Sequence, residues 1–265
     1  MKYVKFILLF LSITTCYAAA ALSDSTGKPG ISHRLKVLSY NLRFGELASL
    51  EELATFINDQ NPDIVALQEV DCRTYRDRAP KQHGKDFATE LGFRTGMLSA
   101  YGKTIPYAGG YYGIAILSKY PLAKVERIYL PKTKNGKEQR AILVADVEYR
   151  EGEYFTFACT HLDYTNTEER QEQVKKINEV LLTKNSPVVV AGDFNASPDA
   201  KEIKEGMSAW KIVSKLEPTV PANAPRSTID YIFCYPKDKW TNIDATTYKV
   251  TLSDHLPVSA VVEMK

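Results

Sequence analysis

The segment GDFN, residues 192–195, directly follows an apolar run, residues 188–191, that has the length of a buried strand. Aspartate and asparagine are common in turns, so this motif alone favours a turn at a strand end. Other apolar runs, however, also end or begin at polar side chains: Asn41, Glu69, His161, Asp230, Asp254 and His255. Unrelated turns would not repeatedly select strand ends. We therefore interpret these residues, together with Asp193 and Asn195, as one functional site.

The residue types in this set favour metal-assisted chemistry on a phosphate. Carboxylate and amide oxygens suit a hard divalent cation such as Mg²⁺, which needs few protein ligands. Histidines move or orient protons near neutral pH, and a carboxylate beside an imidazole fixes its tautomer. A cation would neutralise phosphate oxygens, a carboxylate would take the proton of the attacking water, and the histidines would stabilise the developing charge. The set therefore predicts attack of water on phosphorus.

Alternating strands and helices must position these side chains at one sheet edge, where ligands gather in α/β folds. Strands are expected at residues 35–40, 64–67, 114–117, 141–147, 154–160, 188–191, 229–234 and 257–262. A helix is expected over residues 50–58, with Ser49 and Glu52 as its capping box. Thr165 and Glu168 predict a second capped helix, and Ser197 followed by proline predicts a short third one. No linker divides residues 35–265, which we interpret as one domain.

The N-terminus has the pattern of a secretory leader. Lys2 and Lys5 flank a short apolar run that small residues follow, and the run is too short to span a membrane. We expect residues 1–20 to be a signal peptide and residues 21–34 to be a linker. Cys16 leaves open whether the protein is a lipoprotein with a lipid anchor there. The expected location is periplasmic, secreted or outer-membrane.

Charge argues against nucleic acid as the main partner. The chain of 265 residues has a formal charge of +2, and removal of residues 1–20 removes two lysines and no acid, leaving zero. Proteins that hold nucleic acid through its phosphates are usually clearly basic, so this partner is possible but not favoured. Cys159 and Cys234 lie in apolar runs typical of a core, and the disulfide state of these residues and Cys72 stays open. We expect a monomer.

Seven segments resemble, in order, the motifs of the endonuclease/exonuclease/phosphatase superfamily. They are LSYNLRFG, PDIVALQEVD, YYGIAILSKYPL, THLDYTNTEERQEQV, VVVAGDFNASPD, STIDYIF and LSDHLPVSAVV. This superfamily includes DNase-type and apurinic endonucleases, sphingomyelinases, inositol-polyphosphate phosphatases and deadenylases. The resemblance covers residues 35–264. It implies an α/β fold, a four-layered α/β/β/α sandwich with two mixed β-sheets packed face to face.

The resemblance also implies roles for individual residues. It implies three ligands for Mg²⁺ or Mn²⁺: Asn41, Glu69 and Asp254. It implies five catalytic residues: His161, Asp193, Asn195, Asp230 and His255. Within this second set, Asp193 orients or deprotonates the attacking water, and Asp230 pairs with His255. His255 contacts the scissile phosphate or acts as the base, while His161 and Asn195 hold the phosphate.

Three further residues are candidates for substrate binding. Arg140 follows a polar loop and opens a strand, so its guanidinium could clamp a phosphate through two hydrogen bonds. Arg73 follows Glu69 closely and would then lie in a loop near the site. Tyr112, beside a Gly-Gly pair, could contribute an aromatic wall for a base, a sugar or a lipid headgroup.

Two other hydrolase classes fit the sequence poorly. Ser253, Asp254 and His255 are adjacent, and adjacent side chains of an extended segment point apart, which excludes a Ser–His–Asp triad. Four histidines in all are too few for the binuclear metallophosphatases. We therefore predict an exported Mg²⁺- or Mn²⁺-dependent hydrolase of small-molecule, lipid or sugar phosphoesters. A secreted nuclease and a non-catalytic binding protein on the same fold remain the alternatives.

Overall fold

The computed structural model describes residues 33–134 and 136–265. One mixed sheet has six strands in the order β11-β12-β1-β2-β4-β3. These strands are β1 (His33–Asn41), β2 (Ile64–Cys72), β3 (Leu98–Tyr107), β4 (Gly110–Ser118), β11 (Trp240–Thr247) and β12 (Val258–Met264). β1 pairs with β2 in parallel and with β12 in antiparallel fashion. The carboxyl ends of β1 and β2 therefore lie at the same edge of the sheet.

The second mixed sheet also has six strands, in the order β5-β6-β7-β8-β10-β9. These strands are β5 (Leu122–Tyr129), β6 (Ala141–Arg150), β7 (Glu153–His161), β8 (Val188–Asp193), β9 (Lys211–Ile212) and β10 (Asp230–Tyr235). β7 and β8 form its parallel pair, while β10 runs antiparallel to β8.

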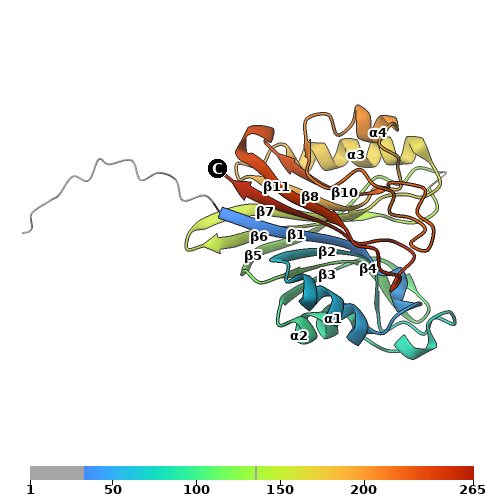
Figure 1. Cartoon of the computed structure of the whole chain (residues 1–265). Helices are drawn as coiled ribbons and strands as arrows, with labels where there is room; N and C mark the ends of the chain where they lie inside the picture. The colour runs from blue at the N-terminus through green and yellow to red at the C-terminus, as the bar shows by residue number, and fades with distance from the viewer. Residues whose placement is uncertain (1–32, 135) are drawn as a thin grey trace, which may run out of the picture. The chain divides into compact units, whose positions relative to one another are not determined.

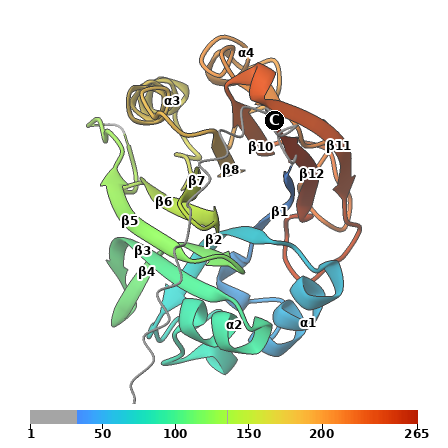
Figure 2. The ribbon, with the colours of Figure 1, turned by 90° about the vertical axis from the view of Figure 1, so that its left-hand side faces the viewer.

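The two sheets pack face to face, and the α-helices cover their outer faces (Figures 1 and 2). α1 (Leu50–Gln60) and α2 (Phe87–Thr95) cover the first sheet, and α3 (Thr167–Leu181) and α4 (Lys201–Lys204) cover the second. Short 3₁₀ turns occur at Arg43–Gly45, Pro80–Gln82 and Lys237–Lys239. Inward-facing residues such as Val37 and Phe157 form the core between the sheets. This arrangement confirms the predicted four-layered sandwich.

The helix caps agree with the sequence at α1 and differ at α3 and α4. Ser49 and Glu52 form the predicted capping box of α1. Asn166 caps α3 in place of Thr165, because Asp163 Oδ1 accepts both the hydroxyl and the backbone N–H of Thr165, each at 2.8 Å. Ser197 and its proline lie in a turn, and α4 begins only at Lys201.

The sequence pattern missed the strands at or near sheet edges. β3, β5 and β11 carry mixed polar and apolar residues on largely exposed faces, so they lack the continuous apolar runs of the central strands. β1 begins at His33, two residues before the predicted start of the domain. The predicted signal peptide, most of the linker and Cys16 lie outside the described residues.

Cys72, Cys159 and Cys234 are free thiols, and the latter two are buried in the core as expected. Within residues 33–134 and 136–265, no helix combines the length and the apolar character that crossing a bilayer requires.

Candidate active site

The strand register brings four polar strand ends to one rim of the sandwich. In the parallel pair of β7 and β8, His161 lies beside Asp193. β10 starts with Asp230, which lies opposite Asp193 from the other side. In the first sheet, Asn41 at the end of β1 lies beside Gln68 of β2, the residue before Glu69. Strand pairing alone therefore assembles much of the set that the sequence singles out.

Hydrogen bonds from Asn41 join the two sheets at this rim. Its amide nitrogen lies 3.1 Å from Asp193 Oδ2 and 3.3 Å from Glu69 Oε1. The same Asp193 oxygen lies 3.4 Å from Nε2 of His161 and 3.7 Å from Nε2 of His255. Residues separated by more than two hundred positions thus meet around a single carboxylate oxygen.

The other oxygen of Asp193 forms the turn that the GDFN motif suggests. Asp193 Oδ1 accepts the backbone N–H of Asn195 at 2.9 Å, and Asn195 has a left-handed backbone with φ of 49°. The Asn195 side chain donates to the Leu162 carbonyl at 3.1 Å. Gly192 is needed because a Cβ there would lie 2.0 Å from the carbonyl oxygen of Thr160. The turn and the functional roles of Asp193 are therefore compatible, one on each oxygen.

His255 lies between two carboxylates. Its Nδ1 is 2.9 Å from Asp230 Oδ2, which also accepts the hydroxyl of Thr219 at 2.6 Å. Burial lowers the pKa of His255, but the charges of Asp230 and Asp193 outweigh burial and raise it to about 10. Burial and the Asp230 charge raise the pKa of Asp193 to about 7. The site thus holds a protonated imidazole beside a carboxylate that can accept a proton near neutral pH.

His161 differs from His255 in its protonation. Burial lowers its pKa well below the ordinary value, and the positive charges of Arg140 and His255 lower it further. His161 is therefore neutral at physiological pH. Its Nδ1 is buried and has no hydrogen-bond partner among the described residues.

Glu69 reaches the rim through a β-bulge in β2. The pairing of β2 with β4 shifts between Leu67 and Val70, and Glu69 itself has a positive φ of 55°. Such a bulge redirects a side chain away from the alternating pattern of the strand. Burial raises the pKa of Glu69, and the positive charge of His255 opposes this effect. Among the described residues, Glu69 forms no ion pair with lysine or arginine.

Asp254, the third predicted metal ligand, forms an ion pair with Arg43. Arg43 also pairs with Glu46, which binds Arg78 at 2.7 Å. This network borders a pocket of about 300 Å³ beside the rim. The sequence analysis did not single out Arg43, although it follows Asn41 by only two positions. The sequence also does not predict the role of Thr219 as a hydrogen-bond donor to Asp230, because a threonine in a loop has no distinguishing pattern.

Two sets of side chains could hold a divalent cation. The ligand atoms of Asp193, Asp230 and His255 lie within 4.8 Å of one another. In this set, however, the protonated His255 already balances the carboxylates and has no lone pair to offer. Glu69 is half-buried and forms no ion pair with lysine or arginine within the described part of the chain, and it lies close enough to Asp254 for that charge to raise its pKa. The donor set around Glu69 therefore fits a hard cation better.

The orientation of the Asn41 side-chain amide bears on its proposed role as a metal ligand. In the observed orientation its amide nitrogen faces the two carboxylates, and its Oδ1 accepts the backbone N–H of Arg43 at 3.0 Å. A carbonyl oxygen has a second lone pair, so ligation is compatible with this hydrogen bond.

Two of the three predicted substrate-binding residues lie beside the site. Arg140 is 97 % buried, as its side chain has an exposed fraction of 3 %. Burial lowers its pKa, but the charge of Glu138 and, to a smaller extent, the charges of Asp193 and Glu69 raise it. Burial and the charge of Glu69 raise the pKa of Tyr112, whereas the positive charge of Arg140 lowers it. These mutual effects place both side chains next to the carboxylates.

Arg73 lies apart from this group. It is exposed and lines a separate pocket of about 640 Å³ with Tyr107 and Tyr111 at the tip of the β3–β4 hairpin. The arginine of this loop that approaches the site is Arg76, whose guanidinium lies 5.3 Å from the ring centroid of Tyr112. Arg76 also binds both carboxylate oxygens of Asp71 at 3.0 Å. Arg73, Arg76 and Arg78 lie in one short loop, and the sequence does not show which of them approaches the site.

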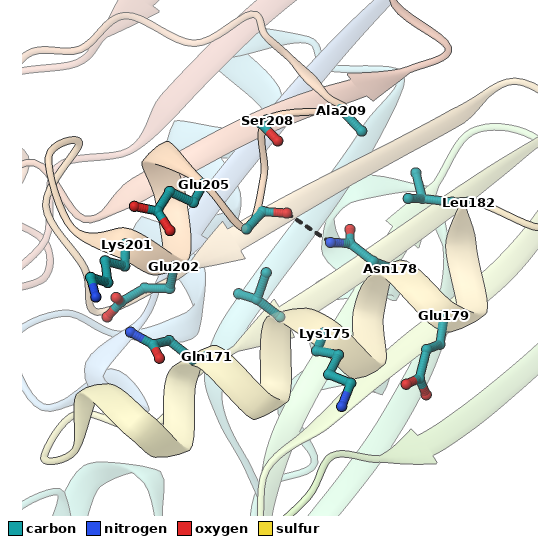
Figure 3. A pocket seen from close by; sticks show the side chains of 12 residues that line it. Gln171, Lys175, Asn178, Glu179, Leu182, Lys201, Glu202, Glu205, Ser208 and Ala209 are labelled. Atoms are coloured by element: carbon teal, nitrogen blue, oxygen red, sulfur yellow. Dashed lines mark hydrogen bonds between the residues drawn. The ribbon is translucent and has the colours of Figure 1, made fainter.

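A pocket of about 820 Å³ lies away from the rim, between α3 and α4 (Figure 3). Its side chains are mixed in charge and include Lys175, Glu179 and Glu205. Asn178 donates to the Gly206 carbonyl at 2.7 Å across it, as the dashed line shows. None of the candidate site residues lines this pocket.

Two stacked six-stranded sheets with helices on their outer faces define a class of fold, the four-layered α/β/β/α sandwich. The chain belongs to the Endonuclease/Exonuclease/phosphatase family, whose model matches residues 38–255. Members of this family are generally metal-dependent hydrolases of phosphoesters.

Several known proteins are similar to the chain. YbhP of Escherichia coli, described as uncharacterized, is 28% identical over 247 residues, which cover 86% of this chain and 96% of YbhP. Exodeoxyribonuclease III of Haemophilus influenzae is 26% identical over 181 residues, 65% of this chain and 61% of that enzyme. The mannosyl-6-phosphatase of Bacteroides thetaiotaomicron has the same fold, with a TM-score of 0.68 at 18% identity over 86% of this chain and 99% of that one.

Proposed function

We propose that this protein is an exported Mg²⁺- or Mn²⁺-dependent phosphoester hydrolase of small-molecule substrates such as sugar or lipid phosphoesters. The observation that carries the proposal is the cluster around Asp193 Oδ2, where Asn41, His161 and His255 converge within 3.7 Å. A binding protein on this fold would not need a buried carboxylate with a pKa near neutrality beside a protonated imidazole.

Asp193 accepts the proton of the attacking water in this proposal. Its Oδ1 is engaged by the Asn195 backbone, which leaves Oδ2 as the proton acceptor. Burial and the Asp230 charge raise the pKa of Asp193 to about 7, and a base with such a pKa operates well near neutral pH. Asn41 orients the carboxylate by donating to Oδ2 at 3.1 Å.

His255 and His161 act on the phosphate. The protonated His255 donates its Nε2–H to a phosphate oxygen on which negative charge develops. Asp230, itself held by the Thr219 hydroxyl, orients the imidazole and keeps it charged. Nε2 of the neutral His161 lies 3.4 Å from the same Asp193 oxygen that His255 approaches. Arg140 contributes a buried positive charge next to these groups.

Glu69 and Asp254, with Asn41, would hold the divalent cation, which when bound neutralises phosphate oxygens and lowers the barrier to attack. The half-buried Glu69 carboxylate, which no lysine or arginine of the described residues neutralises in an ion pair, supports this assignment. Binding of the cation would require Asp254 to share its carboxylate between the cation and Arg43.

Export rests on the composition of residues 1–20, and the small-molecule substrate rests on charge. The part of the chain after residue 20 has no net charge, which disfavours long nucleic acid. The similarity in fold to a mannosyl-6-phosphatase supports a sugar phosphoester as one substrate class. Fractionation of cells that produce the full chain tests export, since recovery in the cytoplasm alone would contradict it.

The activity is tested with the purified protein, Mg²⁺ or Mn²⁺, and a panel of phosphoesters, each with and without chelator. The panel contains sugar phosphates, inositol phosphates, sphingomyelin, plasmid DNA and RNA. We expect chelator-sensitive release of phosphate or alcohol from a small substrate. Tight metal binding without turnover of any member would favour the binding-protein alternative.

A nuclease is the second candidate, because the chain is similar to an exodeoxyribonuclease III. Nicking or shortening of plasmid DNA at a rate above that for all small substrates would favour this candidate. The Asp193→Asn variant is the control for contaminating nucleases, since it must lose whichever activity belongs to the protein.

A further inference from the structure

Buried polar atoms beside the candidate catalytic residues have no hydrogen-bond partner among the described residues. They are Arg140 Nε, Glu138 Oε1, Asp163 Oδ2 and His161 Nδ1. Glu138 Oε1 lies 3.1 Å from Arg140 Nη1, so the two form an ion pair without hydrogen-bond geometry. Arg140 and Asp163 are almost fully buried. Buried polar groups are normally hydrogen-bonded, so several neighbouring donors and acceptors without a hydrogen bond indicate a missing ligand or water.

These groups form one electrostatic cluster. Hydrogen bonds from Thr165 and Asn166 lower the pKa of Asp163 against the effect of burial, and the charge of Arg140 lowers it further. Burial raises the pKa of Glu138, Arg140 opposes this effect, and the charge of Asp163 adds to it. The ring of Tyr164, 6.0 Å from the Arg140 guanidinium, is exposed, and the Glu138 side chain keeps an exposed fraction of 21 %. The cluster therefore opens to solvent on the side of Glu138 and Tyr164.

The loop that carries Glu138 is anchored to α3. The buried carboxylate of Glu169 accepts the backbone N–H of Thr133 with both oxygens, at 2.9 and 3.1 Å. Gln173 donates to the Pro131 carbonyl at 3.3 Å, and Gln139 closes the base of the loop by donating to the Leu130 carbonyl at 2.7 Å. The position of Glu138 is thus built into the fold.

The chemistry of the cluster selects one type of ligand group. A phosphate oxygen only accepts hydrogen bonds, and Arg140 is already ion-paired with Glu138, so Glu138 and Asp163 together leave the cluster with one excess negative charge that disfavours a phosphate. A hydroxyl both donates and accepts, so it can bind a carboxylate oxygen and an arginine N–H together. A neutral sugar or polyol satisfies these atoms, whereas a second phosphate on the substrate is repelled.

We propose that Glu138, with Arg140 and Asp163, forms a subsite that binds the hydroxyls of a neutral polyol leaving group and rejects substrates that carry a second phosphate nearby. The proposal rests on the proposed function, because it concerns the substrate of the same site. It assigns Glu138 as a specificity determinant and disfavours polynucleotides, in which every nucleotide adds a phosphate.

The test compares matched substrates that differ by one phosphate. Glucose 6-phosphate and glucose 1,6-bisphosphate are the monoester pair, and glycerophosphoinositol and glycerophosphoinositol 4-phosphate are the diester pair. Phenyl phosphate and bis(p-nitrophenyl) phosphate report hydrolysis without a polyol. Glu138→Gln removes the charge but keeps an oxygen for Arg140. Glu126→Gln, on the exposed surface of β5, is the matched control. All assays are made at pH 8 with saturating Mn²⁺.

We expect the wild-type protein and the Glu126 variant to prefer the substrate with one phosphate by roughly tenfold in kcat/KM, the factor that one like charge about 7 Å away produces at an effective dielectric constant of about 35, between those of a protein surface and of water. Glu138→Gln should narrow this preference to about threefold or less by gaining activity on the doubly phosphorylated substrate. A variant that had merely lost its structure could not gain activity.

The outcomes separate the two proposals. Absence of hydrolysis of every substrate by the wild-type protein refutes the proposed function itself. Hydrolysis of the phenyl esters with no preference within either pair, or an unchanged preference in Glu138→Gln, refutes the subsite alone.

Discussion

Replacement of Asp193 by asparagine is expected to abolish catalysis and, at the same time, to stabilise the fold. Asp193→Asn preserves the shape of the side chain, including the Oδ1 that accepts the Asn195 backbone N–H at 2.9 Å. It removes the negative charge and the proton acceptor. Because general bases typically contribute 10²–10⁴-fold, kcat should fall by about that factor.

The gain in stability follows from the burial of the carboxylate. Burial and the Asp230 charge raise the pKa of Asp193 from 3.8 to about 7, and ~1.4 kcal/mol per pKa unit gives about 4 kcal/mol as the cost of the ionised form. The amide of the variant faces the Asn41 amide nitrogen, and this mismatch costs about 1–2 kcal/mol. The net gain is of order 2 kcal/mol, or roughly 4–8 °C in Tm for a domain of this size.

The sign of the pH dependence provides an independent check. A raised folded-state pKa means that the stability from the protonated form is fully present below about pH 4 and is lost as the pH rises towards 7. The Asp193→Asn variant has no ionisable group at this position and therefore does not lose this stability as the pH rises. Thermal unfolding at pH 5 and pH 8, with chelator present, should therefore show the larger gain in Tm at pH 8.

The control for this experiment is Asp59→Asn, which changes an exposed aspartate of α1 and should alter neither kcat nor Tm appreciably. The reasoning is refuted if Asp193→Asn keeps kcat within tenfold of the wild-type value. It is also refuted if the variant unfolds at a lower temperature at pH 8, because the carboxylate would then be stabilising.

Three further variants test other parts of the site and fold. Glu69→Gln should weaken Mn²⁺ binding at least tenfold by calorimetry, because it removes the negative charge of a proposed ligand, and unchanged affinity would place the cation elsewhere. Asp230→Asn should lower kcat about 10²-fold and lower the pKa of His255 from about 10 in NMR titrations, so an unshifted titration would contradict the pairing. Ser49→Ala should destabilise the fold by about 1 kcal/mol without changing kcat, and a loss of activity would disprove a purely capping role.

Much of the fold and the site could be predicted from local sequence patterns. Continuous apolar runs marked the central strands, and the capping box at Ser49 marked the start of α1. The polar residues at strand ends, such as His161 and Asp193, meet because parallel neighbours end at the same edge. Edge strands such as β5 escaped prediction because their exposed faces lack an apolar run.

Residues that act through distant contacts could not be predicted in the same way. Arg43 binds Asp254 from 211 positions away, and Thr219 supports Asp230 from a loop without a motif. Arg73 and Arg76 belong to the same short loop, and only the turn of that loop places Arg76 against Tyr112. In the sequence, nothing distinguishes Glu138 from other acidic residues in polar loops, and its importance follows from its contact with the buried Arg140.

The sequence by itself determined the central strands, the start of α1 and the polar side chains at the ends of the central strands, because periodicity and capping depend on neighbours along the chain. Only the tertiary structure decided which of those side chains share a site and in which protonation state. The Asn41–Asp193 hydrogen bond joins two sheets, and the pKa values of Asp193 and His255 depend on burial that both sheets create. Burial and charge proximity are properties of the packed sandwich and are absent from any single segment.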